Sequence, residues 1–359
     1  MKVGIIGMPN AGKSSLFNAL TRAGAQAANY PFTTIEPNVA VVPVADERLE
    51  QVAATVGASE VVPDTIDFHD IAGLVAGAHK GEGLGNQFLA NIRETDALIH
   101  VVRAHQDANV VHSEGSVDPV RDAETVETEL IYADLEQAER RHERVVREAR
   151  GGDAHAIAEE QWLAEVIAAL GEGLPARTVP VPDDAPDAMR LLQPLTGKPV
   201  LIVANVEEGE TEVPEAAAAH AAAEGAGALA ISSRLEAELS ELSDEDAAAM
   251  RADLGLDASG LELVVRGAFD LLDLIAFFTA GEAKPAQSWH TPRGSTAWEA
   301  AGKIHTDIQK GFVRAEVIGW EELVDAGGYS GARDRGTLRT EGRDYVMQGG
   351  AAMTVHVPP

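Results

Sequence analysis

Short apolar runs rich in β-branched residues alternate with amphipathic stretches through much of the chain. The runs that this pattern predicts to be strands are residues 3–6, 65–70, 97–102, 199–204 and 228–232. A helix is predicted from Lys13 to about Arg22, and further helices follow the last of these strands to about residue 274. Strands that alternate with helices are typical of a mostly parallel sheet covered by helices. The sequence therefore predicts an α/β domain.

A long charged segment interrupts this pattern in the middle of the chain. Residues 119–149 repeat apolar side chains at helical spacing, and residues 154–170 do so again after a break at Gly151 and Gly152. Two helices joined by a tight turn form an antiparallel hairpin. We expect this hairpin to project as an arm, because the α/β pattern resumes after it.

The last part of the chain has a different character. Short strands are predicted at 287–291, 312–318 and 353–357, which indicates a mostly β module. The predicted domains are an α/β domain of residues 1–118 and 196–276, an inserted helical arm of residues 119–195, and a C-terminal module of residues 277–359.

Charge and composition narrow the classes of function. The 359 residues include 58 acidic and 28 basic side chains, for a net charge of −30, and this excess repels polyanions and anionic membranes. The C-terminal module carries nine Lys or Arg against ten Asp or Glu, so it is nearly neutral. Such an acidic, lysine-poor chain suits a saline cytoplasm, although a biased genome composition produces the same pattern.

Two absences exclude further chemistry. The chain has no cysteine, which excludes disulfides, thiolate metal sites and cysteine nucleophiles. No apolar run approaches the length of about 20 residues that a bilayer span needs, and the N-terminal run is too short for a signal peptide. We therefore expect a cytoplasmic protein.

The strongest motif lies at the N-terminus. Residues 7–14, GMPNAGKS, match G-x-x-x-x-G-K-[ST] directly after a strand and before a helix, the context in which this motif binds nucleotide phosphates. Main-chain N–H groups face the phosphates, Lys13 reaches the β and γ oxygens, and the Ser14 hydroxyl binds Mg²⁺. The predicted phosphate-binding residues are Asn10, Ala11, Gly12, Lys13, Ser14 and Ser15.

A second motif completes the predicted magnesium site. Asp70 ends a predicted strand about sixty residues after the first motif, and D-x-x-G there holds the Mg²⁺ shell while Gly73 leaves room for a γ-phosphate. The loop between the two motifs offers the hydroxyls of Thr33 and Thr34. The residues alone do not choose between these two threonines.

Four stretches of the chain resemble the YchF family, also called Obg-like ATPases. They are NYPFTTIEPN at 29–38, DIAGLVAGAHKGEGLGNQFL at 70–89, HSEGSVDP at 112–119 and AGKIHTDIQKGFVRAEVI at 301–318. The resemblance covers essentially the whole chain. It implies a P-loop domain, an inserted helical arm, and a C-terminal TGS domain of ubiquitin-like β-grasp fold. It also favours Thr34 over Thr33 as the Mg²⁺ ligand.

The base-reading motif departs from that of guanine-specific relatives. Those proteins use N-K-x-D, whereas residues 205–208 here read N-V-E-E, with Val206 in place of the lysine and Glu208 in place of the aspartate. The family shares this N-x-x-E form, which implies a preference for ATP with contacts from Asn205 and the Val206 backbone. Ser232 begins the loop that relatives close over the base. A solvated acidic loop is the competing interpretation of Glu208.

The water-activating group is not obvious. Leu74 stands where many GTPases have a glutamine after D-x-x-G, so the catalytic group must come from elsewhere. The candidates are Asn10, placed as in relatives that bind K⁺ beside the phosphates, and His112. Lys13, Asn10 and His112 are the predicted catalytic residues, and Mg²⁺ and K⁺ are the predicted cations.

The predicted function is an Mg²⁺-dependent nucleoside triphosphatase, an ATPase that uses nucleotide as a conformational switch. The partner that the resemblance implies is the ribosome. The contact is expected either through the helical arm or through a set of basic residues in the C-terminal module: Lys303, His305, Lys310, Arg314, Arg333, Arg335, Arg339 and Arg343. Scattered, salt-bridged surface charge is an equally good interpretation of that set. The alternatives are a GTPase of the Obg-related class, and an RNA- or ribosome-binding module in which nucleotide is only structural.

Overall fold

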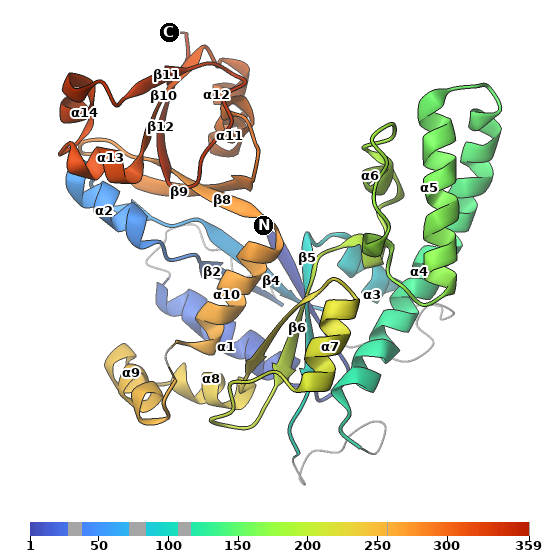
Figure 1. Cartoon of the computed structure of the whole chain (residues 1–359). Helices are drawn as coiled ribbons and strands as arrows, with labels where there is room; N and C mark the ends of the chain where they lie inside the picture. Colours follow the sequence, from blue (N-terminus) through green and yellow to red (C-terminus); the bar gives the residue numbers. More distant parts are fainter. Residues whose placement is uncertain (28–37, 72–83, 107–115, 257, 359) are drawn as a thin grey trace. The chain divides into compact units, whose positions relative to one another are not determined.

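The computed structural model describes residues 1–27, 38–71, 84–106, 116–256 and 258–358 (Figure 1). The chain forms two compact units. The N-terminal unit consists of Met1–Val42 and Asp67–Leu271, and the C-terminal unit consists of Pro43–Ile66 and Leu272–Pro359. Among the described residues, no helix has both the length and the apolar character that a bilayer span requires.

A six-stranded sheet forms the centre of the N-terminal unit, in the order β2-β4-β1-β5-β6-β7. Its strands are β1 (Lys2–Ile6), β2 (Val39–Pro43), β4 (Thr65–Asp70), β5 (Ala97–Arg103), β6 (Val200–Asn205) and β7 (Gly227–Ile231). The pairs β1–β4, β1–β5, β5–β6 and β6–β7 are parallel. Every residue of β5 and β6 is buried, as expected for central strands covered on both faces.

Helices cover both faces of this sheet (Figure 1). The helices of this unit are α1 (Lys13–Ala27), α3 (Leu84–Arg93), α4 (Pro119–Ala149), α5 (Ala154–Gly171), α6 (Ala188–Leu192), α7 (Glu215–Ala223), α8 (Ser233–Leu239), α9 (Asp244–Asp253) and α10 (Gly260–Leu271). Successive strand residues face opposite sides, so Ile202 packs in the core under α3, α4 and α7, whereas Leu201 lies against Gly267 of α10.

The helices α4 and α5 form the predicted antiparallel arm. Asp118 caps the start of α4 by accepting from the Arg121 N–H at 3.1 Å, and Pro119 occupies the first turn. Asp153 caps α5 in the same way after the turn at Gly152, which has a φ of 78°. Trp162 is 2 % exposed in the apolar seam between the helices, so tertiary packing holds the arm together.

The C-terminal unit has a mixed six-stranded sheet in the order β11-β10-β12-β8-β9-β3. Its strands are β3 (Val61–Val62), β8 (Leu274–Thr279), β9 (Ala286–Pro292), β10 (Arg314–Gly319), β11 (Arg339–Glu341) and β12 (Ala351–His356), and its helices are α2 (Glu47–Val56), α11 (Ala297–Ile304), α12 (Thr306–Lys310), α13 (Trp320–Asp325) and α14 (Tyr329–Arg335). Phe277 faces α11, and its neighbour Phe278 faces α2, α13 and α14. A mixed sheet with a helix packed across it is the predicted β-grasp arrangement, and the predicted fold class is confirmed.

The units divide the chain differently from the predicted boundaries. The sequence pattern places residues 43–66 in the α/β domain, but Leu49 and Val52 of α2 pack against Phe278, and β3 pairs with β9 through Val61 and Ala286. The predicted boundary after residue 276 also falls inside β8. This apolar strand follows α10 after only two residues, so the pattern does not separate its start from the helical region before it.

Candidate nucleotide site

The loop between β1 and α1 has the backbone that the phosphate motif requires. Gly7 and Gly12 have φ values of 146° and 106°, which side chains rarely adopt. A Cβ at Gly7 would lie 2.3 Å from the Val101 carbonyl oxygen, and one at Gly12 would lie 2.3 Å from the Asn205 Nδ2. Both positions therefore need glycine for conformation and for space.

Lys13 begins α1 and is only 8 % exposed. Its Nζ donates to the carbonyl oxygens of Gly7 at 2.9 Å and Met8 at 2.8 Å. Burial lowers the pKa of Lys13, and the opposing charge of Asp70 partly offsets that effect. The ammonium therefore lies inside the loop, where the oxygens of a phosphate would be its natural acceptors.

Asp70 reaches the same edge of the sheet from the neighbouring strand. It ends β4 and is the register partner of Ile5, two residues before the loop begins. Burial raises the pKa of Asp70, opposed by the charge of Lys13, and its Oδ1 is buried without a hydrogen-bond partner among the described residues. An unsatisfied carboxylate oxygen close to the start of the helix that carries the exposed Ser14 fits a hard cation such as Mg²⁺.

Other predicted phosphate-site residues are placed by the same loop. Asn10 is exposed, with a φ of 62°, and Ala11 is buried. Ser15 lies in the first turn of α1, whose N–H groups have no acceptors within the helix. Thr34, Gly73 and His112 lie outside the described residues, so their predicted roles remain predictions.

Asn205 joins the loop to the opposite end of the site. Its Nδ2 donates to the Ala11 carbonyl oxygen at 3.0 Å, and its Oδ1 accepts from the Ser233 N–H at 2.9 Å. Both ends of the amide are therefore bound to protein backbone. Asn205 acts as a clamp between the phosphate loop and the start of α8, and its predicted contact with the base remains a prediction.

The remaining base-site residues surround this clamp. Val206 is 2 % exposed, and its N–H donates to the Ile231 carbonyl oxygen at 2.9 Å, which leaves only its carbonyl for a ligand. Glu208 is exposed and lies 3.4 Å from the Arg234 Nε. Ser232 caps α8 through a bond from the Leu235 N–H. The N-x-x-E segment and the first turn of α8 thus meet through a salt bridge.

Two residues near this site are not singled out by the sequence. Arg103 ends β5 and is 2 % exposed, with its Nε donating to the His105 carbonyl oxygen at 3.2 Å. His105 is the second: its Nε2 lies 3.3 Å from the Asn205 Nδ2, and its Nδ1 lies 3.9 Å from the Glu207 Oε1. An arginine at the end of a fully buried strand is the signal that could have pointed to this corner of the site.

The chain is similar over its full length to known proteins. A family model described as a 50S ribosome-binding GTPase matches residues 2–133, and the YchF GTPase C-terminal model, described as a protein of unknown function, matches residues 274–357. Proteins named ribosome-binding ATPase YchF are 46 % identical in Haemophilus influenzae and 43 % identical in Bacillus subtilis. The alignments cover 98 % of this chain in both cases, and 98 % and 97 % of those proteins.

A solved structure agrees with this similarity. The structure of the Schizosaccharomyces pombe YchF GTPase superposes with a TM-score of 0.86 at 32 % identity, covering 99 % of this chain and 97 % of that one. The superposed part of the chain includes the phosphate loop, Asp70 at the end of β4 and the N-x-x-E segment with Asn205. The chain belongs to the YchF family.

Proposed function

We propose that this protein is an Mg²⁺-dependent ATPase that cleaves the β–γ phosphoanhydride bond of its nucleotide. The observation that carries the proposal is the meeting of Lys13, the unsatisfied Asp70 carboxylate and the α1 N-terminus at one sheet edge. These groups have the charge and hydrogen-bonding capacity that a triphosphate and its metal need. The names of the bacterial relatives support ATPase activity.

The proposed cation and phosphate contacts are those that the sequence motifs predict. Ser14, Thr34 and Asp70 would hold Mg²⁺, which supplies charge neutralisation of the phosphates when bound. Lys13 and the main chain of residues 10–15 would bind the phosphate oxygens, and Gly73 would meet the γ-phosphate. This arrangement leaves His112 or a K⁺ ion beside Asn10 to activate water.

Phosphate release with Mg²⁺ and ATP tests this part of the proposal. We expect turnover by the full chain, and we expect no turnover when EDTA removes Mg²⁺. Comparison of K⁺ with Na⁺ buffer separates the two candidates: K⁺ stimulation that Asn10→Ala abolishes supports the ion, and a loss of kcat in His112→Ala supports the histidine. Full turnover in EDTA would contradict the magnesium assignment.

We also propose that ATP binds more tightly than GTP. The Glu208 carboxylate, which would have to accept from both guanine donors, is already 3.4 Å from Arg234. Its longer side chain cannot reproduce aspartate geometry from the same backbone position. The alternative is a GTPase of the Obg-related class, because the fission yeast relative is called a GTPase and the family that matches residues 2–133 is described as one.

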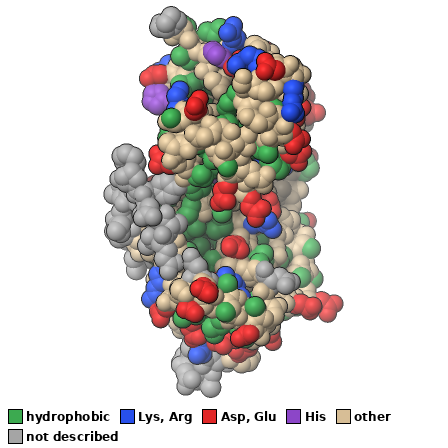
Figure 2. All heavy atoms as spheres, turned by 90° about the vertical axis from the view of Figure 1, so that its left-hand side faces the viewer, with side chains coloured by type: hydrophobic (Ala, Val, Ile, Leu, Met, Phe, Trp, Pro, Cys, Tyr) green, Lys and Arg blue, Asp and Glu red, His purple; other side chains and the backbone are tan. Residues whose placement is uncertain are grey.

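The proposed partner is the ribosome, which the names of the bacterial relatives include. A ribosomal partner would place the protein in the cytoplasm. The basic residues predicted for RNA contact are all exposed in the C-terminal unit, where Figure 2 shows Lys and Arg (blue) mixed with Asp and Glu (red) in its upper part. Arg333 and Arg339 lie near Glu316 and Glu341, so part of this charge is compensated locally.

Ribosome pelleting tests the partner and the role of nucleotide together. We expect association to differ between ADP and a non-hydrolysable ATP analogue, whereas equal association would favour a binding module with a structural nucleotide. Replacing Arg333, Arg335, Arg339 and Arg343 by Ser should weaken association. Replacing Arg144, Arg147 and Arg150 on the arm by Ser should leave association unchanged. If the arm variant loses association and the C-terminal variant keeps it, the contact lies on the arm.

A further inference from the structure

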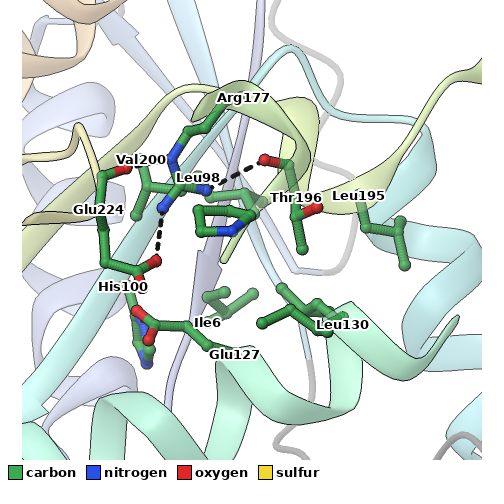
Figure 3. Close-up of a pocket in the computed structure, with 12 residues that line it drawn as sticks. Ile6, Leu98, His100, Glu127, Leu130, Arg177, Leu195, Thr196, Val200 and Glu224 are labelled. Atoms are coloured by element: carbon green, nitrogen blue, oxygen red, sulfur yellow. Dashed lines mark hydrogen bonds and ion pairs between the residues drawn. The ribbon is translucent and has the colours of Figure 1, made fainter. Parts of the chain in front are cut away.

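A second cluster of titratable side chains lies under the α4–α7 face of the sheet (Figure 3). Glu127 comes from α4 and His220 from α7, and Glu224 is the C-cap of α7, four residues after His220 and therefore on the same side of the helix. His100 of β5 lies beside them and is the register partner of Ile6, the residue before the phosphate loop. The predicted nucleotide site uses none of these side chains.

Glu127, His220 and Glu224 bring their donor atoms together. One carboxylate oxygen from each glutamate and one ring nitrogen of His220 all lie within 4.8 Å of one another. The His220 Nε2 and the Glu127 Oε2 are 2.9 Å apart. These three side chains are only 10–13 % exposed. A small shift would place all three donors around one ion.

Hydrogen bonding within the cluster is incomplete. The Glu127 Oε1 and the His100 Nε2 are buried and have no hydrogen-bond partner among the described residues. His100 is 2 % exposed at its side chain, and its Nδ1 lies 4.0 Å from the Glu127 Oε1.

The nearby guanidinium does not balance the cluster. Arg177 lies 3.1 Å from the Glu224 Oε2 and donates to the carbonyl oxygens of Glu224 and Thr196. These bonds hold the Arg177 guanidinium in place, and its contact with the Glu224 carboxylate is through Oε2 (Figure 3). The carboxylates of Glu127 and Glu224 carry two negative charges, and Arg177 carries one positive charge. The remaining negative charge can be offset either by a proton on His220 or by a bound cation.

A small cavity adjoins two of the three donors, Glu127 and Glu224. His100, Glu127, Arg177 and Glu224 line it together with apolar side chains, and it leaves about 10 Å³ for the centre of a water-sized molecule. That space is close to the minimum for one water. Three protein ligands with a water in the fourth position make a common zinc arrangement.

We propose that Glu127, His220 and Glu224 bind one divalent transition-metal ion of the zinc class, bracing α4 against α7 beside the strand that precedes the phosphate loop. The imidazole ligand favours such an ion over Mg²⁺ or Ca²⁺, which prefer oxygen ligands. The metal takes the place of the proton on His220, because a ligating imidazole must be neutral. Glu224 keeps its contact with Arg177 through one oxygen and offers the other.

Titration of the chelator-treated full chain with Co²⁺ and with Zn²⁺ tests this site. Excess Mg²⁺ and ADP are present to fill the nucleotide site. We expect one equivalent of Co²⁺ with visible d–d absorption, displaced by Zn²⁺, and proton release on binding. His220→Gln and Glu224→Gln should each weaken binding at least about tenfold.

The matched control is His155→Ala on the arm, because the His155 Nε2 also lies against a carboxylate, 2.7 Å from Asp187, but without a third ligand close by among the described residues. It should leave the affinity unchanged. Circular dichroism of each variant distinguishes loss of a ligand from loss of the fold. No bound equivalent in the wild type, or equal affinity in a folded His220→Gln or Glu224→Gln variant, would overturn the proposal.

Discussion

The phosphate end and the base end of the nucleotide site are built in different ways. The phosphate end comes from consecutive residues, where β1, the loop and α1 place Lys13 against the carbonyls of Gly7 and Met8. The base end joins Asn205 to Ala11, 194 residues earlier, and to Ser233, 28 residues later. A motif that folds within one strand–loop–helix unit can be recognised from sequence, whereas the second construction depends on tertiary structure.

The two ends are nevertheless coupled at one position. Gly12 belongs to the phosphate motif, but the atom that a Cβ there would meet first is the Asn205 Nδ2. The glycine thus allows the base-end clamp to reach the loop backbone. Substitutions at the two ends can test whether they act separately or through this contact.

The largest expected effect concerns the phosphate end alone. Lys13→Ala removes a buried ammonium that charge-assisted bonds to phosphate would use, so we expect loss of hydrolysis and weaker ATP binding by about 2 kcal/mol or more. The control is Lys303→Ala, an exposed lysine of the C-terminal unit. Phosphate-release assays and calorimetry measure both quantities. Wild-type turnover in the Lys13 variant would remove the phosphate-site assignment.

The next effect tests the coupling. Gly12→Ala strains a φ of 106° and places a Cβ 2.3 Å from Asn205, so both ends should be disturbed, at a cost of roughly 1–3 kcal/mol for the strain alone. Gly225→Ala is a matched control, because its φ is 65° and no atom lies within 4 Å of the added Cβ. Thermal unfolding and ATP binding should both suffer more at Gly12. Equal losses in the two variants would mean that strain, not the clamp contact, explains the effect.

A third substitution tests the same contact between the phosphate end and the base end by changing the base-end residue. Asn205→Ala leaves the Ala11 carbonyl and the Ser233 N–H without their partner, which we expect to destabilise the fold by about 1–3 kcal/mol. We expect the clamp to position both ends of the site, so ATP and GTP binding should weaken by similar factors. Calorimetry with each nucleotide measures this ratio. A selective loss of ATP binding would instead show that Asn205 contacts the base.

The sequence predicts the local parts of this molecule better than the distant pairings. The bounds of α4 are predicted correctly, because Asp118, Pro119 and the apolar spacing act within the helix itself. The location of α2 is not, because its partners include Phe278, more than 220 residues away. Spacing likewise identifies Lys13 and Asp70 as site residues, while only the fold brings His105 to Asn205 and Glu127 to His220.

The smallest expected effect concerns base choice. The wild type should bind ATP more tightly than GTP by about 1 kcal/mol, the scale of one net hydrogen bond, because Glu208 is paired with Arg234 and the Val206 N–H is bound to Ile231. Substituting both Val206→Lys and Glu208→Asp should move the preference toward GTP. Val206 lies in the core, so Glu208→Asp alone is the variant to measure if the double change fails to fold, and it should shift preference in the same direction. The control Glu207→Asp, in the same loop, should leave the preference unchanged. Calorimetry that finds GTP bound tenfold more tightly than ATP by the wild type would contradict this prediction and make the base end a guanine site despite its altered motif.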